Sequence, residues 1–174
     1  MSDLVKVESS GFLEIWKDPE KIRKLFCANL TMEEFQFFMG LSKKLEADPF
    51  KREIWPVKFK DKPATIFCGR DLYRRKAQDQ ENYIRHYSEA IYTKDTIVVK
   101  NGVPDHTYNP LSRGQLVGAY CVLYCKGKDK PFFNLVKLEE YDKKFARWNI
   151  AKEEMIKKVA ESQVLRMAYQ ALYA

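Results

Sequence analysis

The chain has 174 residues, the size of one domain with room for a hydrophobic core. Its 31 lysines and arginines against 24 aspartates and glutamates give a formal net charge of +7, which favours a polyanionic partner. No segment approaches the ~20 apolar residues of a membrane span, and the N-terminus lacks an apolar signal core, so we expect no membrane association and a cytoplasmic location.

The cysteine and histidine pattern argues against a metal site. The four cysteines form no CxxC pair, and Cys121 and Cys125 are expected to lie on one strand, about 13 Å apart. His86 and His106 stand outside metal-ligand spacing of any cysteine. We therefore expect reduced thiols and no bound zinc.

The N-terminal part of the chain is predicted to contain two helices. An Asp-Pro pair at residues 18–19 supplies an N-cap and a first-turn proline for a helix that runs toward residue 26. Thr31 and Glu34 have the spacing of a capping box. The second helix is expected to end near Asp48, and its core stripe is mostly apolar: Phe35, Phe38, Met39, Ser42 and Leu45.

The middle of the chain is predicted to be rich in β-strands. Residues 54–60 alternate in polarity and residues 64–68 return after a turn, which indicates a hairpin with Pro56 at an edge or a bulge. Asp71 is expected to cap a short helix. The remaining segments are expected to be strands at residues 87–92 and 96–100, a polar loop at 101–114, the most apolar strand at 117–125, a basic turn at 126–130, and a strand at 132–138.

The last third is predicted to be helical, with a break around residues 148–151 and a long helix over residues 155–169. Gln163 falls within the apolar stripe of this helix, where its amide needs a partner. A second side presents a polar and basic row flanked by two large apolar residues: Lys158, Ser162 and Arg166, with Leu165 and Tyr169. We expect this side to contact something besides its own domain.

Together these elements predict one α+β domain over residues 1–174, in which helices flank an antiparallel sheet built from β-hairpins and the chain ends in a long basic helix. Four sequence blocks add to this pattern: residues 48–55, 63–71, 118–124 and 155–169. In order and in register, they resemble segments of the RecT/Bet group of phage single-strand annealing proteins, relatives of the Red-beta recombinase.

The resemblance implies an ATP-independent protein that binds single-stranded DNA and anneals complementary strands in phage homologous recombination. It implies no enzymatic activity and no cofactor. Such proteins form oligomeric rings or helical filaments, hold single-stranded and annealed duplex DNA, and can work with a phage exonuclease and a host single-strand binding protein in a bacterial cytoplasm. Residues 1–17 are then expected to be a flexible segment or an arm between subunits.

Annealing requires that phosphates be neutralised while the pairing edges of the bases stay free. The candidate DNA-binding residues are the basic side chains of four segments, with one supporting amide: Lys58, Lys60, Arg70, Arg74, Arg75, Lys126, Lys128, Lys157, Lys158 and Arg166, with Gln163. Tyr73, Trp148 and Tyr169 are expected either to stack on bases or to pack in the core.

Two other classes of function stay open. A metal-dependent nuclease needs converging carboxylates, and Glu53, Asp61, Asp71, Glu139, Glu140 and Asp142 show no spacing typical of a two-metal site. The chain has no P-loop sequence, which argues against use of ATP. The other alternative is a sequence-specific or RNA-binding module.

Overall fold

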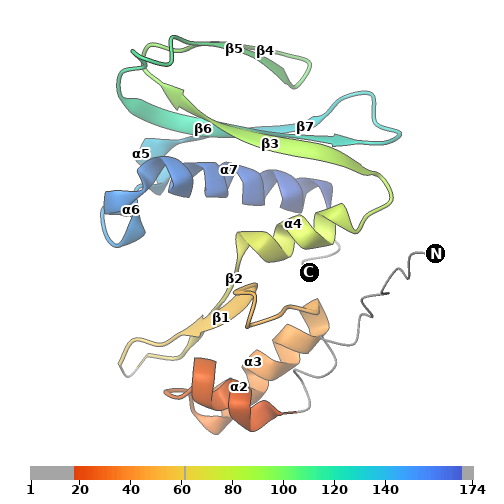
Figure 1. Cartoon of the computed structure of the whole chain (residues 1–174), viewed down its shortest axis with the longest axis vertical. Helices are drawn as coiled ribbons and strands as arrows, with labels where there is room; N and C mark the ends of the chain where they lie inside the picture. Colours follow the sequence, from red (N-terminus) through yellow and green to blue (C-terminus); the bar gives the residue numbers. More distant parts are fainter. Residues whose placement is uncertain (1–17, 61, 170–174) are drawn as a thin grey trace, which may run out of the picture. The chain divides into compact units, whose positions relative to one another are not determined.

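The computed structural model describes residues 18–60 and 62–169, which form a first unit that ends at Leu72 and a second unit that begins at Tyr73 (Figure 1). Helices and antiparallel strands occur together, so the predicted α+β class is confirmed. In the part of the chain that the structure describes, none of the helices combines the length and the hydrophobicity that a membrane span requires.

The two helices of the first unit begin as their sequence predicts. In α2 (Pro19–Phe26), the Asp18 carboxylate accepts a hydrogen bond from the Lys21 backbone N–H at 3.0 Å. In α3 (Met32–Leu45), Thr31 and Glu34 form the expected reciprocal capping box. The five residues of the predicted core stripe are all buried, but α3 ends at Leu45, before the predicted end near residue 48.

The predicted hairpin of the first unit is present but shorter. Strand β1 (Ile54–Val57) pairs antiparallel with β2 (Thr65–Cys68). Ile54 belongs to the buried core of the helices, and Ile66 and Cys68 pack against it. Gly69 follows, where a Cβ atom would lie 2.6 Å from the backbone oxygen of Arg52, so this close approach requires glycine.

The second unit is built on one antiparallel sheet of order β3-β6-β7, with β3 at Tyr83–Tyr92, β6 at Leu116–Cys125 and β7 at Phe132–Lys137. Helix α7 (Lys152–Ala168) lies along one face of this sheet (Figure 1). Ala77 of α4 (Arg70–Gln78) joins the same core. Helix α4 starts at Arg70, so Asp71 lies in its first turn and the prediction that Asp71 caps it is wrong.

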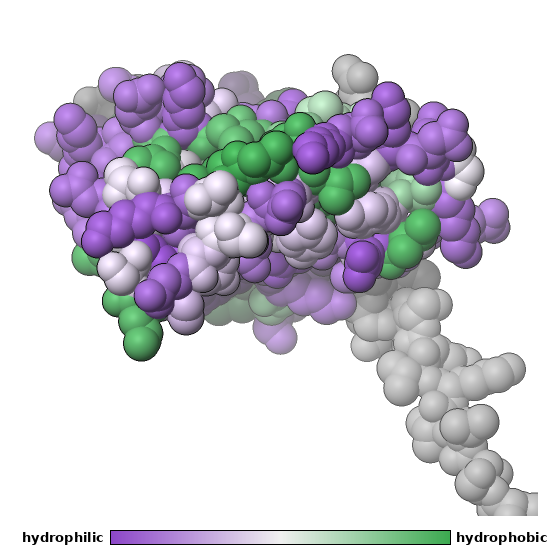
Figure 2. All heavy atoms as spheres, turned by 90° about the horizontal axis from the view of Figure 1, so that it is seen from above, coloured by the Kyte–Doolittle hydropathy of each residue, from purple (hydrophilic) through white to green (hydrophobic). Residues whose placement is uncertain are grey.

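The other face of the sheet is covered by a second hairpin, β4 (Thr96–Lys100) with β5 (Val103–Thr107), whose Ile97 packs against the sheet. The prediction of a polar loop at 101–114 is therefore wrong for residues 103–107. Asn101 and Gly102 both have positive φ, 53° and 77°, and Asn-Gly is the preferred sequence of a tight hairpin turn. Figure 2 looks onto this side and shows a band of hydrophobic side chains bordered by hydrophilic ones.

Two short helices connect the sheet to α7. They are α5 (Leu138–Tyr141) and α6 (Arg147–Ile150), and Trp148 of α6 is buried in the core of the second unit. Ala151 leaves the helical conformation, with φ −146° and ψ 51°, which confirms the predicted break. Helix α7 begins directly after it, three residues before the predicted start at residue 155.

Candidate nucleic-acid interface

The buried surface of α7 is wider than the sequence pattern indicates. Leu165 is 0% exposed and Tyr169 7%, and both belong to the core of the second unit. The expectation that these two side chains face DNA or a neighbouring subunit is therefore wrong. Met167 on the same helix is 54% exposed. The core includes α4 residue Ala77 as well as sheet residues, so neighbours surround more of the helix than a single face.

The amide of Gln163 is bonded at both ends within the second unit. Its Oε1 accepts a hydrogen bond from the Asn134 side chain on β7, and its Nε2 donates to the Tyr141 hydroxyl on α5 at 2.8 Å. The expectation that this amide needs a partner is thus confirmed. Its partners fix α7 against the strand and the short helix that precede it.

A buried carboxylate on α7 holds one of the candidate DNA-binding cations. Glu161 is 1% exposed, and it accepts hydrogen bonds from Arg74, with Nη2 at 3.0 Å from Oε2, and from His86 Nε2 at 3.0 Å. His86 Nδ1 lies 2.8 Å from the Tyr83 hydroxyl. Burial alone would raise the pKa of Glu161, but the hydrogen bonds from His86 and Arg74 outweigh it and lower the pKa. Arg74 therefore serves the core of this unit.

Three more candidate cations are also paired with carboxylates. Their pairs are Lys58 with Glu34 at 2.7 Å, Lys157 with Glu153 at 3.0 Å and Arg75 with Asp79 at 3.6 Å. The first pair is the most organised. A hydrogen bond from Lys58, followed by the backbone N–H groups of Thr31 and Ala64, lowers the pKa of Glu34 to about 2. Lys58 therefore joins the hairpin of the first unit to the start of α3.

The exposed candidate cations of the second unit come together at one end of it. Lys126 and Lys128 lie in the β6–β7 turn, and Arg166 lies in the last turns of α7. The Tyr169 hydroxyl at the end of α7 is 3.4 Å from Cys125 Sγ, directly before that turn. This contact places the C-terminal end of α7 beside the β6–β7 turn. We call this surface the basic end, and define it as Lys126, Lys128, Lys130 and Arg166, all exposed.

The other candidates lie elsewhere. Lys60 is exposed in the first unit, and Arg70 and Lys158 are partly buried. One cation that the sequence pattern did not single out is Arg85 on β3, which is exposed and stacks on Tyr124 with its guanidinium 5.0 Å from the ring centre. Among the stacking candidates, Trp148 and Tyr169 are buried and Tyr73 packs against the same core.

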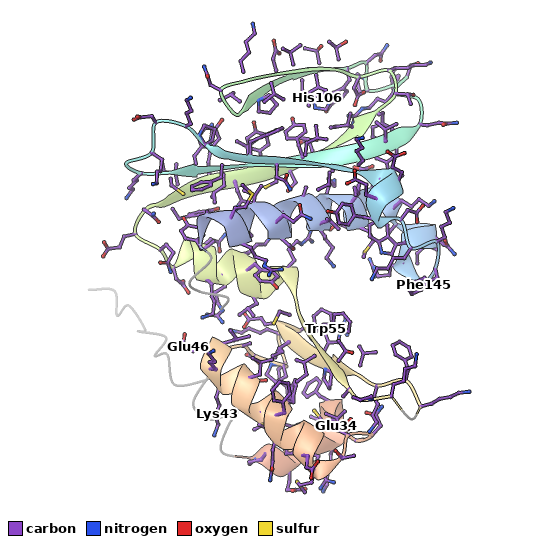
Figure 3. All side chains as sticks on the ribbon, turned by 180° about the vertical axis from the view of Figure 1, so that it is seen from behind. Glu34, Lys43, Glu46, Trp55, His106 and Phe145 are labelled. Atoms are coloured by element: carbon purple, nitrogen blue, oxygen red, sulfur yellow. The ribbon has the colours of Figure 1, made fainter. Side chains whose placement is uncertain are left out.

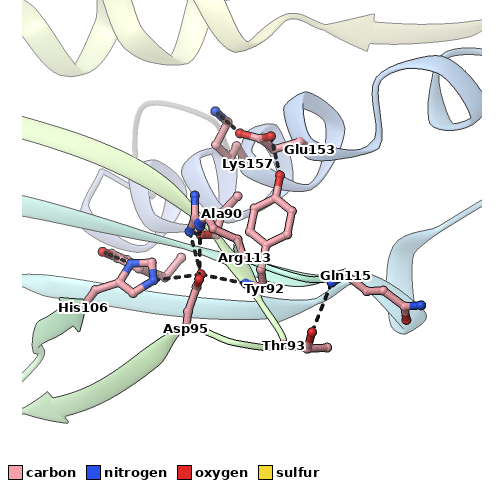
Figure 4. Close-up of polar contacts among 10 residues, drawn as sticks. Ala90, Tyr92, Thr93, Asp95, His106, Arg113, Gln115, Glu153 and Lys157 are labelled. Atoms are coloured by element: carbon pink, nitrogen blue, oxygen red, sulfur yellow. Dashed lines mark hydrogen bonds and ion pairs between the residues drawn. The ribbon is translucent and has the colours of Figure 1, made fainter. Parts of the chain in front are cut away.

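A second buried cluster joins the β4–β5 hairpin to the sheet (Figure 4). Asp95 accepts hydrogen bonds from Arg113, with Nη2 at 2.6 Å and Nε at 3.1 Å, and its Oδ2 lies 3.1 Å from His106 Nε2. Arg113 also donates to the Ala90 carbonyl and stacks on Tyr108 at 3.7 Å. The hydrogen bonds from Arg113 are the main reason that the pKa of Asp95 is lowered to about 2. The hydrogen bond from His106 lowers it further.

The same cluster reaches α7. The ring of Tyr92 lies 4.4 Å from the Arg113 guanidinium, and the Tyr92 hydroxyl donates to Glu153 at 2.7 Å. This hydrogen bond is the main cause of the lowered pKa of Glu153, which in turn accepts from Lys157. A continuous series of polar contacts therefore runs from the hairpin through the sheet edge to the first turns of α7.

These lowered carboxyl pKa values predict acid-sensitive folding. The pKa of Asp95 is about 2 in the folded protein against an ordinary 3.8, so its contribution is complete above about pH 4 and is lost as the pH falls toward 2. Chemical unfolding followed by circular dichroism should show the free energy of unfolding falling across this range. The free energy of unfolding of the Asp95→Asn variant should fall less steeply with decreasing pH. Parallel curves for the two proteins would show that Asp95 does not cause the acid sensitivity.

Comparison with known proteins agrees with the sequence resemblance. The model of the RecT family matches residues 11–172, nearly the whole chain. No curated protein matches the chain. Within the part of the chain that the structure describes, no group of three or more His, Cys, Asp or Glu side chains is arranged to hold a metal ion.

Proposed function

Because this chain belongs to the RecT family of phage single-strand annealing proteins that act in DNA recombination, we propose that it anneals complementary strands without ATP, as an oligomeric ring or helical filament. In this proposal the whole chain acts as one annealing domain in the cytoplasm of a bacterial host. Its substrates are single-stranded DNA and the annealed duplex, and a phage exonuclease and a host single-strand binding protein are its proposed partners.

The family match over residues 11–172 is the observation that supports this function most directly. The basic end adds a physical reason. Lys126, Lys128, Lys130 and Arg166 are exposed cations on two elements that meet at the Cys125–Tyr169 contact. Cations placed in this way neutralise phosphates without reading base edges, as sequence-independent annealing requires.

The proposal predicts cofactor-free annealing. Two complementary oligonucleotides, one with a fluorophore and one with a quencher, should pair several times faster with the purified protein than alone, in buffer without nucleotide. The same reaction with two non-complementary strands should show no quenching. An annealing rate equal to the spontaneous rate, at protein concentrations that coat the strands, would refute the proposal.

A further inference from the structure

The hairpin of the first unit presents its larger aromatic residues to solvent. Ile54 is 0% exposed, whereas its neighbour Trp55 is 36% exposed. Trp55 pairs directly across the hairpin with Phe67, which is 43% exposed. In a strand, successive side chains point to opposite faces, so the face with Ile54 packs on the helices and the face with Trp55 stays outside (Figure 3).

The two exposed rings form an ordered surface. Trp55 and Phe67 are stacked, with ring centres 6.4 Å apart and planes 19° from parallel. The Trp55 ring also lies against the backbone at Gly69, where an added Cβ atom would be 3.0 Å from it. Cross-strand pairing and this contact hold the rings in place, so little conformational entropy is lost when a flat ligand stacks on them.

Exposed cations lie at both ends of the hairpin. Lys51 and Arg52 precede β1, and Lys60 and Lys62 lie in the turn between the strands, beside Phe59, which is 69% exposed. Two carboxylates of this unit, Glu34 and Glu53, are bonded within it. Glu34 is bonded to Lys58, and Glu53 is 3% exposed and accepts a hydrogen bond from the Asp48 backbone N–H. The hairpin therefore combines flat aromatic rings with positive charge.

We propose that Trp55 and Phe67 form a stacking site for unpaired nucleobases, with Lys60 and Lys62 on the adjoining phosphates. This inference rests on the proposed function. Aromatic rings accept any base, because every base has a π-face, which suits a sequence-independent annealing protein. In a duplex, the faces of each base are covered by the neighbouring base pairs. The site therefore binds a strand that is still unpaired and releases it once it has paired.

A strand without bases tests this site directly. The parent should bind a single-stranded oligo-dT at least tenfold tighter than an abasic strand of the same length, which has phosphates but no bases. Trp55→Ala and Phe67→Leu should remove most of that preference and leave the affinity for the abasic strand unchanged. The loss of base stacking corresponds to an affinity for oligo-dT that is lower by about tenfold. Phe37→Leu is the matched control, since Phe37 is 66% exposed on α3.

Trp55→Phe keeps a ring and should retain most of the preference, which guards against a fold defect in Trp55→Ala. If the ring variants keep the parental preference for oligo-dT, the stacking site is refuted. If they change particle size in light scattering while the preference stays, this face binds a second copy instead. Annealing is measured separately, so loss of annealing with the preference intact would refute the proposed function and not this site.

Discussion

Replacing Arg113 by methionine is expected to lower the free energy of unfolding by about 3 kcal/mol or more, because removing one partner of a buried ion pair leaves the other charge uncompensated. The Asp95 side chain is 0% exposed and receives two hydrogen bonds from Arg113. The substitution also removes the stacking on Tyr92 and Tyr108. In a thermal melt, the midpoint should fall by about 10 °C.

Arg85→Met is the matched control for this change. Arg85 also stacks on a tyrosine, but it is exposed, so its loss should cost about 0.5–1 kcal/mol. The double variant Asp95→Asn, Arg113→Met should recover part of the stability, because the buried carboxylate charge is then gone. Equal melting temperatures for the Arg113 and Arg85 variants would show that the cluster does not stabilise the second unit.

Removing the three side chains Lys126, Lys128 and Arg166 together should reduce the affinity for single-stranded DNA by about 100-fold at 0.1 M salt. Each phosphate contact contributes about 0.7 to the slope of log affinity against log salt. With ~4–6 contacts per subunit the parental slope should be near −3 to −4, and the triple alanine variant should be shallower by about 2. Fluorescence anisotropy at several salt concentrations gives both quantities.

The control removes the same number of positive charges from ion pairs: Lys58→Ala, Arg75→Ala, Lys157→Ala. Because these cations are paired with Glu34, Asp79 and Glu153, this variant should keep the parental salt slope. Melting curves of both variants must show folded protein at the assay temperature. If the two triple variants lose affinity equally, only the net charge matters and the basic end is not the contact surface.

Local signals in the sequence predict where most helices and strands begin and how their apolar residues repeat. The capping residues Asp18, Thr31 and Glu34 act within one turn of chain, so their effect can be read directly. The sequence does not predict the β5 strand, because Pro104 and Asp105 are unfavourable in strands, although the preceding Asn101-Gly102 is a typical hairpin turn. Pro104 and His106 are partly buried on the same side of the strand, and the His106 ring packs against Tyr120 of β6 with ring centres 5.5 Å apart.

The candidate site depends on contacts that no local pattern can show. Arg74 and Glu161 are 87 residues apart in sequence, so nothing in either segment indicates that this cation is bound to a buried carboxylate. Periodicity predicts the direction of the apolar stripe of α7 but not its width, so it places Leu165 on the wrong surface. In β1, both Ile54 and Trp55 are apolar, and alternation alone cannot decide which of them is buried.

The position of Cys121 on β6 gives the second unit a chemical reporter of its own opening. Cys121 lies on the face of β6 that packs against α7, and burial raises the pKa of its thiol to about 12. Alkylating reagents attack the thiolate, so Cys121 offers them almost none at neutral pH while the unit is folded. Each labelled Cys121 would therefore record an event in which the sheet and α7 had separated, and the labelling rate would measure how often that happens.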